Sequence, residues 1–203
     1  MNRTVARSTP YAWPYDASME PSRLALVVVL PGSDGSAAGD GAPGPDPALD
    51  PVLDRIALLA GATHGIGGVV VEVTATPRSR SGQAVQRLGG TGLKGEVQRV
   101  VAGGIDGFFA STLDATLRAL GRDQLLICGQ WLETNVHSTM RSANDRGYEC
   151  LLVLDACAPI DPDLVPASRS QVEMSGGIFG AVGDTAAVLD ALLPQPHFEK
   201  ELT

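Results

Sequence analysis

Cysteine and histidine side chains are the groups of this chain best suited to nucleophilic or metal chemistry, and there are three of each. A zinc site needs three or four ligands at close spacing, but no two histidines follow a His-x-His or His-x-x-x-His pattern. The cysteines lie in apolar runs or just beyond one, which predicts buried thiols in a reducing compartment. We therefore expect no metal. The residues concerned are Cys128, Cys150, Cys157, His64, His137 and His197.

One glycine-rich segment, residues 90–95 (GTGLKG), matches the Gly-x-Gly-x-x-Gly spacing of dinucleotide-binding turns. Such a turn must follow a strand and open a helix. The preceding residues 83–88 (QAVQRL) are not typical of a buried strand. The chain also has neither a Walker loop nor the Gly-x-Ser-x-Gly turn of serine hydrolases. We therefore expect no cofactor.

Length, composition and charge narrow the class of protein. With 203 residues, 44% of them hydrophobic, the chain can form one domain with a substantial core. A net charge of −8 and an aromatic content of 4% disfavour nucleic-acid binding, which relies on basic surfaces and stacking rings. No apolar run approaches the ~18 residues of a transmembrane helix, and the N-terminus lacks the apolar core of a secretory signal. We therefore expect a cytoplasmic protein with no membrane or nucleic-acid partner.

Apolar, β-branched runs alternate with amphipathic segments along the chain. Residues 24–30 (LALVVVL) are typical of a strand that is buried on both faces, as in a parallel sheet. Strand and helix alternate five or six times, which predicts a three-layer, doubly wound α/β sheet, mostly parallel, with about six strands. The predicted strands are 24–30, 67–73, 99–102, 124–128, 149–154 and 177–182, and the predicted helices are 50–62, 111–120, 134–146, 163–174 and 184–193.

The predicted domain begins after a proline-containing segment. Three prolines interrupt any helix in residues 1–22, which are predicted to form an extended N-terminal arm with turns. Residues 23–194 form the α/β domain and residues 195–203 a C-terminal tail. Since doubly wound sheets bind ligands at the carboxyl ends of their strands, we expect the site in the loops that follow the strands.

The most informative part of the sequence is the stretch Gly121–Asp155, which begins just before the fourth predicted strand and ends just after the fifth. It combines an opening motif, a glycine, a Thr-x-x-x-Ala helix and an Asp-Ala pair, without a gap. The residues are Gly121-Arg122-Asp123-Gln124-Leu125, Gly129, Thr139, Ala143 and Asp155-Ala156. This arrangement resembles the isochorismatase superfamily, the cysteine-hydrolase-like α/β proteins that include nicotinamidases.

Two further segments are similar to the isochorismatase branch of siderophore and phenazine pathways. They are residues 20–23 (EPSR) and 74–77 (TATP). The resemblance implies a doubly wound sheet of about six strands, assembled as a dimer or larger homo-oligomer. It also implies that Asp155 is structural.

The resemblance places unreactive side chains at the positions of the family's reacting groups. The aspartate that ends the first strand corresponds to Leu30, the lysine that ends the third strand to Ala102, and the nucleophilic cysteine of the amidase branch to Asn135. Leucine cannot give the proton that activates a vinyl ether, and asparagine cannot form an acyl intermediate. A shifted alignment would place His137 at the cysteine position, but it requires a gap.

Other side chains at the same strand ends are candidates to line the site or to replace the missing acid. Glu133 lies on the strand-to-helix turn and is the preferred acid, with Asp34 and Asp106 as alternatives. The predicted catalytic residues are Glu133 and Asn135, and the predicted substrate-binding residues are Trp131, Gln130, Thr76, Asp106, Leu30 and Ala102.

Each of these residues also has a structural interpretation. Asn135 can act as a helix cap, Trp131 can simply pack in the core, and the carboxylates can be solvated. Three arginines that could contact a substrate carboxylate can equally lie on a solvated loop. They are Arg78, Arg80 and Arg87.

Three functions remain open from the sequence. The first is a repurposed enzyme that acts on a small carboxylated metabolite in a specialised biosynthetic pathway, with Glu133 as its acid. The second is a catalytically silent relative that binds a ligand or a partner. The third is a vinyl-ether hydrolase that uses a relocated acid, Asp34.

Overall fold

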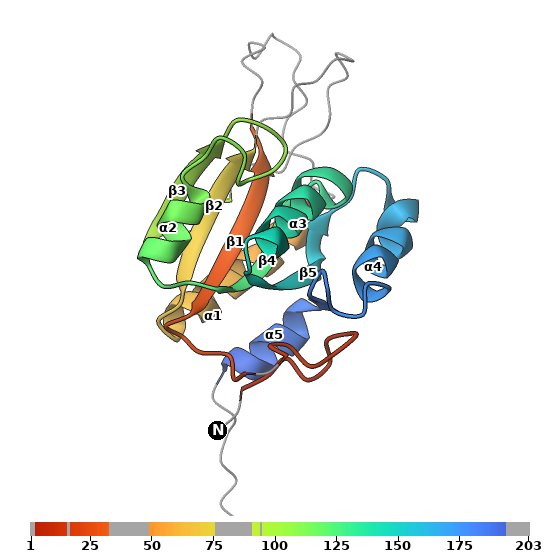
Figure 1. Ribbon diagram of the computed structural model, residues 1–203, viewed down its shortest axis with the longest axis horizontal. Helices are drawn as coiled ribbons and strands as arrows, with labels where there is room; N and C mark the ends of the chain where they lie inside the picture. Colours follow the sequence, from red (N-terminus) through yellow and green to blue (C-terminus); the bar gives the residue numbers. More distant parts are fainter. Residues whose placement is uncertain (1–2, 16, 33–48, 76–90, 94, 194–203) are drawn as a thin grey trace, which may run out of the picture.

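The computed structural model describes residues 3–15, 17–32, 49–75, 91–93 and 95–193 (Figure 1). Its centre is a six-stranded, fully parallel sheet with the strand order β3-β2-β1-β4-β5-β6. The strands are β1 (Leu24–Pro31), β2 (Val69–Ala75), β3 (Val97–Ala102), β4 (Gln124–Gln130), β5 (Glu149–Ala158) and β6 (Ala181–Gly183). The predicted doubly wound α/β fold is confirmed.

Helices cover both faces of the sheet, which explains the continuous apolar runs. Every residue of β4 is buried, as are the first six residues of β1. In Figure 1, α2 and α3 lie in front of the sheet and α1 lies behind it. The helices are α1 (Asp50–Gly65), α2 (Leu113–Ala119), α3 (His137–Asp145), α4 (Val165–Glu173) and α5 (Thr185–Leu192), with short helical turns η2 (Leu132–Val136) and η3 (Pro162–Leu164).

Most element boundaries differ from the sequence prediction by one to three residues, and three elements differ more. The helix predicted at 134–146 is divided into the π-helical turn η2 and the α-helix α3. Strand β5 continues four residues beyond the predicted end at Leu154, because its last residues still pair with β4 past a register shift. Strand β6 is shorter than predicted, since two glycines just before it, Gly177 and Gly180, have positive φ angles.

The N-terminal arm packs on the sheet edge that β6 forms. Thr9 pairs with Val182 in an antiparallel bridge, and Val5 pairs with Trp13 across the turn of the arm. The side chains of Val5 and Trp13 are fully buried, so the arm contributes to the core. Figure 1 shows the arm next to α5.

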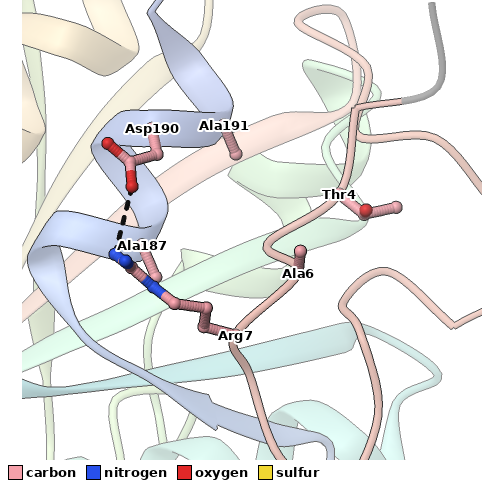
Figure 2. A pocket seen from close by; sticks show the side chains of 6 residues that line it. All are labelled: Thr4, Ala6, Arg7, Ala187, Asp190 and Ala191. Carbon is pink, nitrogen blue, oxygen red and sulfur yellow. Dashed lines mark hydrogen bonds and ion pairs between the residues drawn. The ribbon is translucent and has the colours of Figure 1, made fainter.

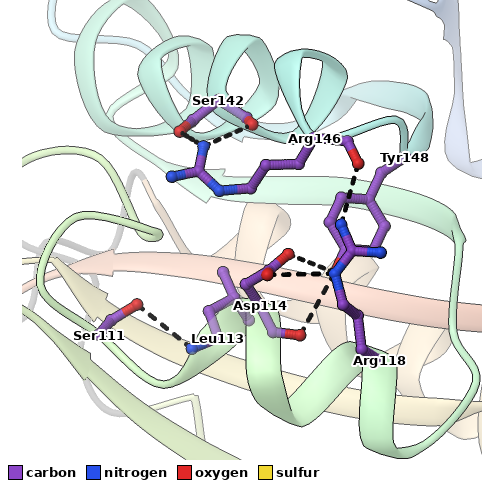
Figure 3. A network of polar contacts seen from close by, with 7 residues as sticks. All are labelled: Ser111, Leu113, Asp114, Arg118, Ser142, Arg146 and Tyr148. Carbon is purple, nitrogen blue, oxygen red and sulfur yellow. Dashed lines mark hydrogen bonds and ion pairs between the residues drawn. The ribbon is translucent and has the colours of Figure 1, made fainter.

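A polar network attaches α2 to the turn between α3 and β5 (Figure 3). The Tyr148 hydroxyl donates to Asp114 Oδ1 at 2.8 Å, and Arg118 Nε donates to Asp114 Oδ2 at 3.1 Å. Arg118 also donates to the Arg146 carbonyl at 3.0 Å, which links the two helices directly.

Within the described part of the chain, none of the helices has the length and apolar character needed to cross a membrane.

Candidate functional site

The carboxyl ends of β1, β2 and β3 lie side by side; we call this end of the strands the carboxyl edge of the sheet. Pro31 of β1 is paired with Ala75 of β2, which is in turn paired with Ala102 of β3. Leu30 precedes Pro31 and is partly buried, whereas Ala102 is 2% exposed. The sheet therefore brings the predicted positions Leu30 and Ala102 to the same edge.

Asn135 joins this edge from η2. Its side chain is 1% exposed, and its Nδ2 donates to the Ala75 carbonyl at 3.3 Å. Its Oδ1 accepts a hydrogen bond from Thr134 Oγ1 at 2.9 Å. Neither η2 nor α3 has a side-chain N-cap hydrogen bond, so Asn135 does not act as a helix cap. The three positions inferred from the resemblance thus lie around one strand end, that of β2.

Gln130 and Trp131 connect β4 to η2. The peptide bond between them is cis, Gln130 is fully buried and Trp131 is 8% exposed. The Trp131 carbonyl accepts hydrogen bonds from the amides of Thr134 at 3.3 Å and Val136 at 3.0 Å. These two hydrogen bonds hold the first turn of η2, which carries Asn135.

Glu133, the preferred acid, holds a loop. One of its carboxylate oxygens accepts from the Ile160 amide at 2.8 Å, and the other accepts from the Asp161 amide at 3.2 Å. These residues follow β5, so the Glu133 carboxylate joins η2 to the segment after that strand.

Asp106, the second candidate acid, stabilises its own turn in the loop that follows β3. Its Oδ1 accepts a hydrogen bond from the Phe108 amide at 2.8 Å. The neighbouring Gly107 amide donates to Thr139 Oγ1 of α3 at 2.9 Å, which anchors the loop on the helix. A side chain at Gly107 would contact Thr139 and Val73 at 3.1 Å, so this loop packs closely.

His137, the nucleophile position of the shifted alignment, lies on a different side of the η2–α3 segment. It is 6% exposed and hydrogen-bonds to the backbone of Ser168 in α4. Burial lowers the pKa of His137, the positive charge of Arg141 lowers it further, and Glu133 opposes the shift. Asn135, and not His137, is the side chain bonded to the sheet edge.

Several sequence candidates lie outside the described residues. They are Thr76, Asp34, Arg78, Arg80 and Arg87, together with Gly90 and Lys94 of the 90–95 glycine-rich segment.

The three cysteines are free and buried, as predicted. Burial raises the pKa of Cys128, Cys150 and Cys157, which keeps these thiols protonated and unreactive. Among the residues that the structure describes, no three His, Cys, Asp or Glu side chains are grouped so as to hold a metal ion.

A surface cavity of about 260 Å³ lies between the N-terminal arm and α5, where sequence analysis predicted nothing (Figure 2). Figure 1 shows this region at the opposite end of the molecule from the carboxyl ends of the strands. Arg7 and Asp190 form an ion pair across it at 3.1 Å. The remaining lining residues are Thr4, Ala6, Ala187 and Ala191. The two charged side chains that line this cavity, Arg7 and Asp190, are paired with each other rather than directed at a ligand. We therefore place the candidate site at the carboxyl ends of the strands instead.

These features define a class: a doubly wound α/β protein with its candidate site at the carboxyl edge, next to the turn after β4. A family model described as the isochorismatase domain matches residues 47–187. The chain is 33% identical over 89 residues to an uncharacterized isochorismatase family protein of Bacillus subtilis, YddQ. That match covers 40% of this chain and 49% of the relative, so the chain spans about half the length of the curated relative that it matches.

Solved structures show the same fold. A cysteine hydrolase from Pseudomonas syringae superposes with a TM-score of 0.68 at 20% identity, over 86% of this chain and 94% of that one. The nicotinamidase SaPncA from Staphylococcus aureus superposes with a TM-score of 0.60 at 19% identity, over 80% of this chain and 99% of that one. With the family model covering most of the domain, the chain belongs to the isochorismatase family.

Proposed function

We propose that this protein binds a small metabolite at the carboxyl edge of its sheet without the Asp/Lys/Cys chemistry of its hydrolase relatives. The observation that supports this proposal is that Leu30, Ala102 and Asn135 occupy positions near the carboxyl end of β2, although Leu30 and Ala102 lie in successive rows of the sheet. None of these side chains can act as an acid, a cation or a nucleophile. Acyl transfer needs an activated nucleophile, and vinyl-ether hydrolysis needs a proton donor.

The contacts of the neighbouring carboxylates support a binding role for the site rather than catalysis by a substitute acid. Glu133 and Asp106 both accept hydrogen bonds from backbone amides. Both residues thus support loops next to the site, and this is the role that we propose for them.

The ligand class and assembly follow from the family resemblance. We propose a carboxylated metabolite of a specialised biosynthetic pathway, in the siderophore and phenazine branch, bound by a cytoplasmic homo-oligomer. The buried amide of Asn135 is bonded to the Ala75 carbonyl and the Thr134 hydroxyl, so we propose that it shapes the site at the end of β2. Ligand sites of this kind use a few placed polar groups to orient the ligand.

Binding and turnover assays on the full chain test this proposal. We expect no hydrolysis of isochorismate, nicotinamide or simple amides at stoichiometric protein, but saturable binding of isochorismate or chorismate by calorimetry. Asn135→Leu keeps the side-chain size and removes the amide, so it should weaken binding about tenfold.

Asn144→Leu is the matched control, because Asn144 lies on α3 away from the sheet edge. It should leave the binding constant unchanged. Catalytic turnover by the wild-type chain, or equal loss of binding in both variants, would contradict the proposal.

A further inference from the structure

Three side chains on one stripe of the η2–α3 segment hold the chain between β5 and β6. Glu133, His137 and Arg141 are spaced four residues apart, which places them on the same helical face. Glu133 binds the amides of Ile160 and Asp161. His137 hydrogen-bonds to the Ser168 backbone, and the Arg141 guanidinium lies 3.7 Å from the centre of the Phe179 ring.

The held segment, residues 159–180, buries little apolar surface of its own. In α4 only Ser168 and Val172 are buried. Four large apolar side chains of the segment are instead exposed. They are Ile160, Leu164, Met174 and Ile178, at 51%, 46%, 76% and 75% exposure. Regions with few buried apolar contacts open at low free energy, so the contacts to η2–α3 decide how firmly the segment docks.

The other side of α4 contacts the N-terminal arm. Thr9 hydrogen-bonds to Glu173 and accepts from Arg169 at 3.3 Å, while Arg169 and Glu173 pair at 2.8 Å. The charged groups of α4 are thus engaged with each other and with the arm. The charges that act on the His137 ring are those of Glu133 and Arg141.

His137 is the contact of the stripe that changes its charge near neutral pH. Its Nε2 is buried and has no hydrogen-bond partner among the described residues. A proton at this atom would create a buried cation one helical turn from Arg141, with Glu133 as the compensating charge. Such a cation is costly unless water reaches it, and water reaches it when the segment lifts away.

We propose that His137 is a proton-sensitive latch: proton uptake at its Nε2 releases residues 159–180 from the η2–α3 segment. Asn135 lies in η2, two residues before His137. Release of residues 159–180 would therefore also loosen the candidate site. This inference concerns the docking of the segment and does not depend on what the site binds.

The direction of the effect follows from the burial of the ring. The pKa of His137 in the docked state is lowered, first by burial and then by Arg141. The open state has an ordinary histidine pKa of about 6.5 and takes up the proton more readily. Docking is therefore strongest above that pH and weakens as the pH falls through 6.5 toward the lowered value.

Hydrogen exchange of the full-length protein tests the latch. Between pH 7.5 and pH 5.5, after correction for intrinsic exchange rates, the protection of amides in residues 160–179 should fall by up to about tenfold. Amides of β1 and β4 should keep their protection. His137→Gln has a neutral side chain at both pH values and should remove the pH response of the segment.

His64→Gln is the matched control, because His64 is a partly buried histidine on α1, far from residues 159–180 in the sequence, that bonds the Glu96 carbonyl. It should keep the wild-type response. A pH-independent segment in the wild type, or an equal pH response in His137→Gln, overturns the proposal. Should His137→Gln fail to fold, an NMR titration of the wild-type ring decides, because a His137 pKa at or above 6.5 also overturns it.

Discussion

The two ends of the sheet differ in how their side chains are used. At the amino end, Arg23 forms a two-pronged ion pair with Asp123, its Nε and Nη2 donating to the two carboxylate oxygens at 2.8 and 2.9 Å. Arg122 donates to the Pro21 carbonyl at 2.6 Å. At the carboxyl end, Leu30 and Ala102 make no comparable contacts among the described residues, and Asn135 makes one to the backbone of β2.

This difference explains why the sequence resembles the isochorismatase family clearly, whereas the family's reacting groups are not recognisable in it. Residues 20–23 (EPSR) and 121–125 (GRDQL) are hydrogen-bonded to each other, and these contacts hold the starts of β1 and β4 side by side. They therefore report the fold. The reacting groups of the family lie at the carboxyl ends of the strands, where side chains can change without disturbing the contacts at the amino end. The proposed absence of the family's reacting groups is therefore compatible with an intact amino end.

The largest expected effect concerns the backbone that shapes the carboxyl end. Gly129 has a φ angle of 125°, and a side chain there would place its Cβ 2.0 Å from the Val29 carbonyl oxygen. Gly129→Ala should therefore lower the free energy of unfolding by about 3–5 kcal/mol, from strain and overpacking together. Urea denaturation followed by circular dichroism measures the loss.

Gly121→Ala separates the two causes of that loss. Gly121 also has a positive φ, 67°, but a Cβ there meets no atom within 4 Å. Its substitution should cost about 1–2 kcal/mol, the strain alone. Equal losses at both glycines would show that close packing against β1 does not constrain the carboxyl end.

An intermediate effect is expected at the amino end. Gln124 is fully buried, its Oε1 accepts from the Glu20 amide at 2.9 Å, and its Nε2 donates to the Ser18 carbonyl at 3.0 Å. Gln124→Leu leaves both backbone groups without this partner and should cost about 2–3 kcal/mol in urea denaturation. It should not change ligand affinity, because the motif lies away from the carboxyl end.

Gln98→Leu is the control for Gln124, since Gln98 lies on the edge strand β3 and donates to Glu96 at 3.4 Å. We expect a change within about 0.5 kcal/mol. A loss at Gln124 no greater than at Gln98 would remove the argument that this motif specifies the fold.

Sequence patterns predicted the fold well for a physical reason. The buried run of β1 and the alternation of strands and helices depend on local composition, which the sequence displays directly. The roles of Glu133 and His137 depend on Ile160 and Ser168, which are 27 and more residues away in the chain. Neither contact has a local signal, so the sequence did not predict that Glu133 anchors a loop, and its role as an acid stays a prediction.

The position of Asn135 was predictable because it follows the strand by a fixed number of residues. Its hydrogen bond to the Ala75 carbonyl was not predictable, since Ala75 belongs to a strand two places away in the sheet. The assignment of Leu30, Ala102 and Asn135 to the family's reacting positions rests on the resemblance and stays a prediction.

The smallest expected effect lies in the polar network near the start of β5 (Figure 3). The Tyr148 hydroxyl bond is the largest cause that holds the pKa of Asp114 below its usual range, and Arg118 adds to it. Tyr148→Phe removes that bond and should cost about 1 kcal/mol at pH 7. The Asp114 side chain is 41% exposed, so solvent screening limits the effect.

The pH dependence gives this last variant a distinctive signature. A carboxyl whose pKa is lowered by folding contributes stability above its unfolded value of about 3.9 and loses it as the pH falls through the lowered value. The gap between wild type and Tyr148→Phe should therefore shrink below about pH 4. Tyr15→Phe, an exposed tyrosine of the arm, should show no gap at either pH. A gap for Tyr148→Phe that is constant with pH would mean that ring packing, and not the bond to Asp114, fixes α2 to the amino end of the sheet.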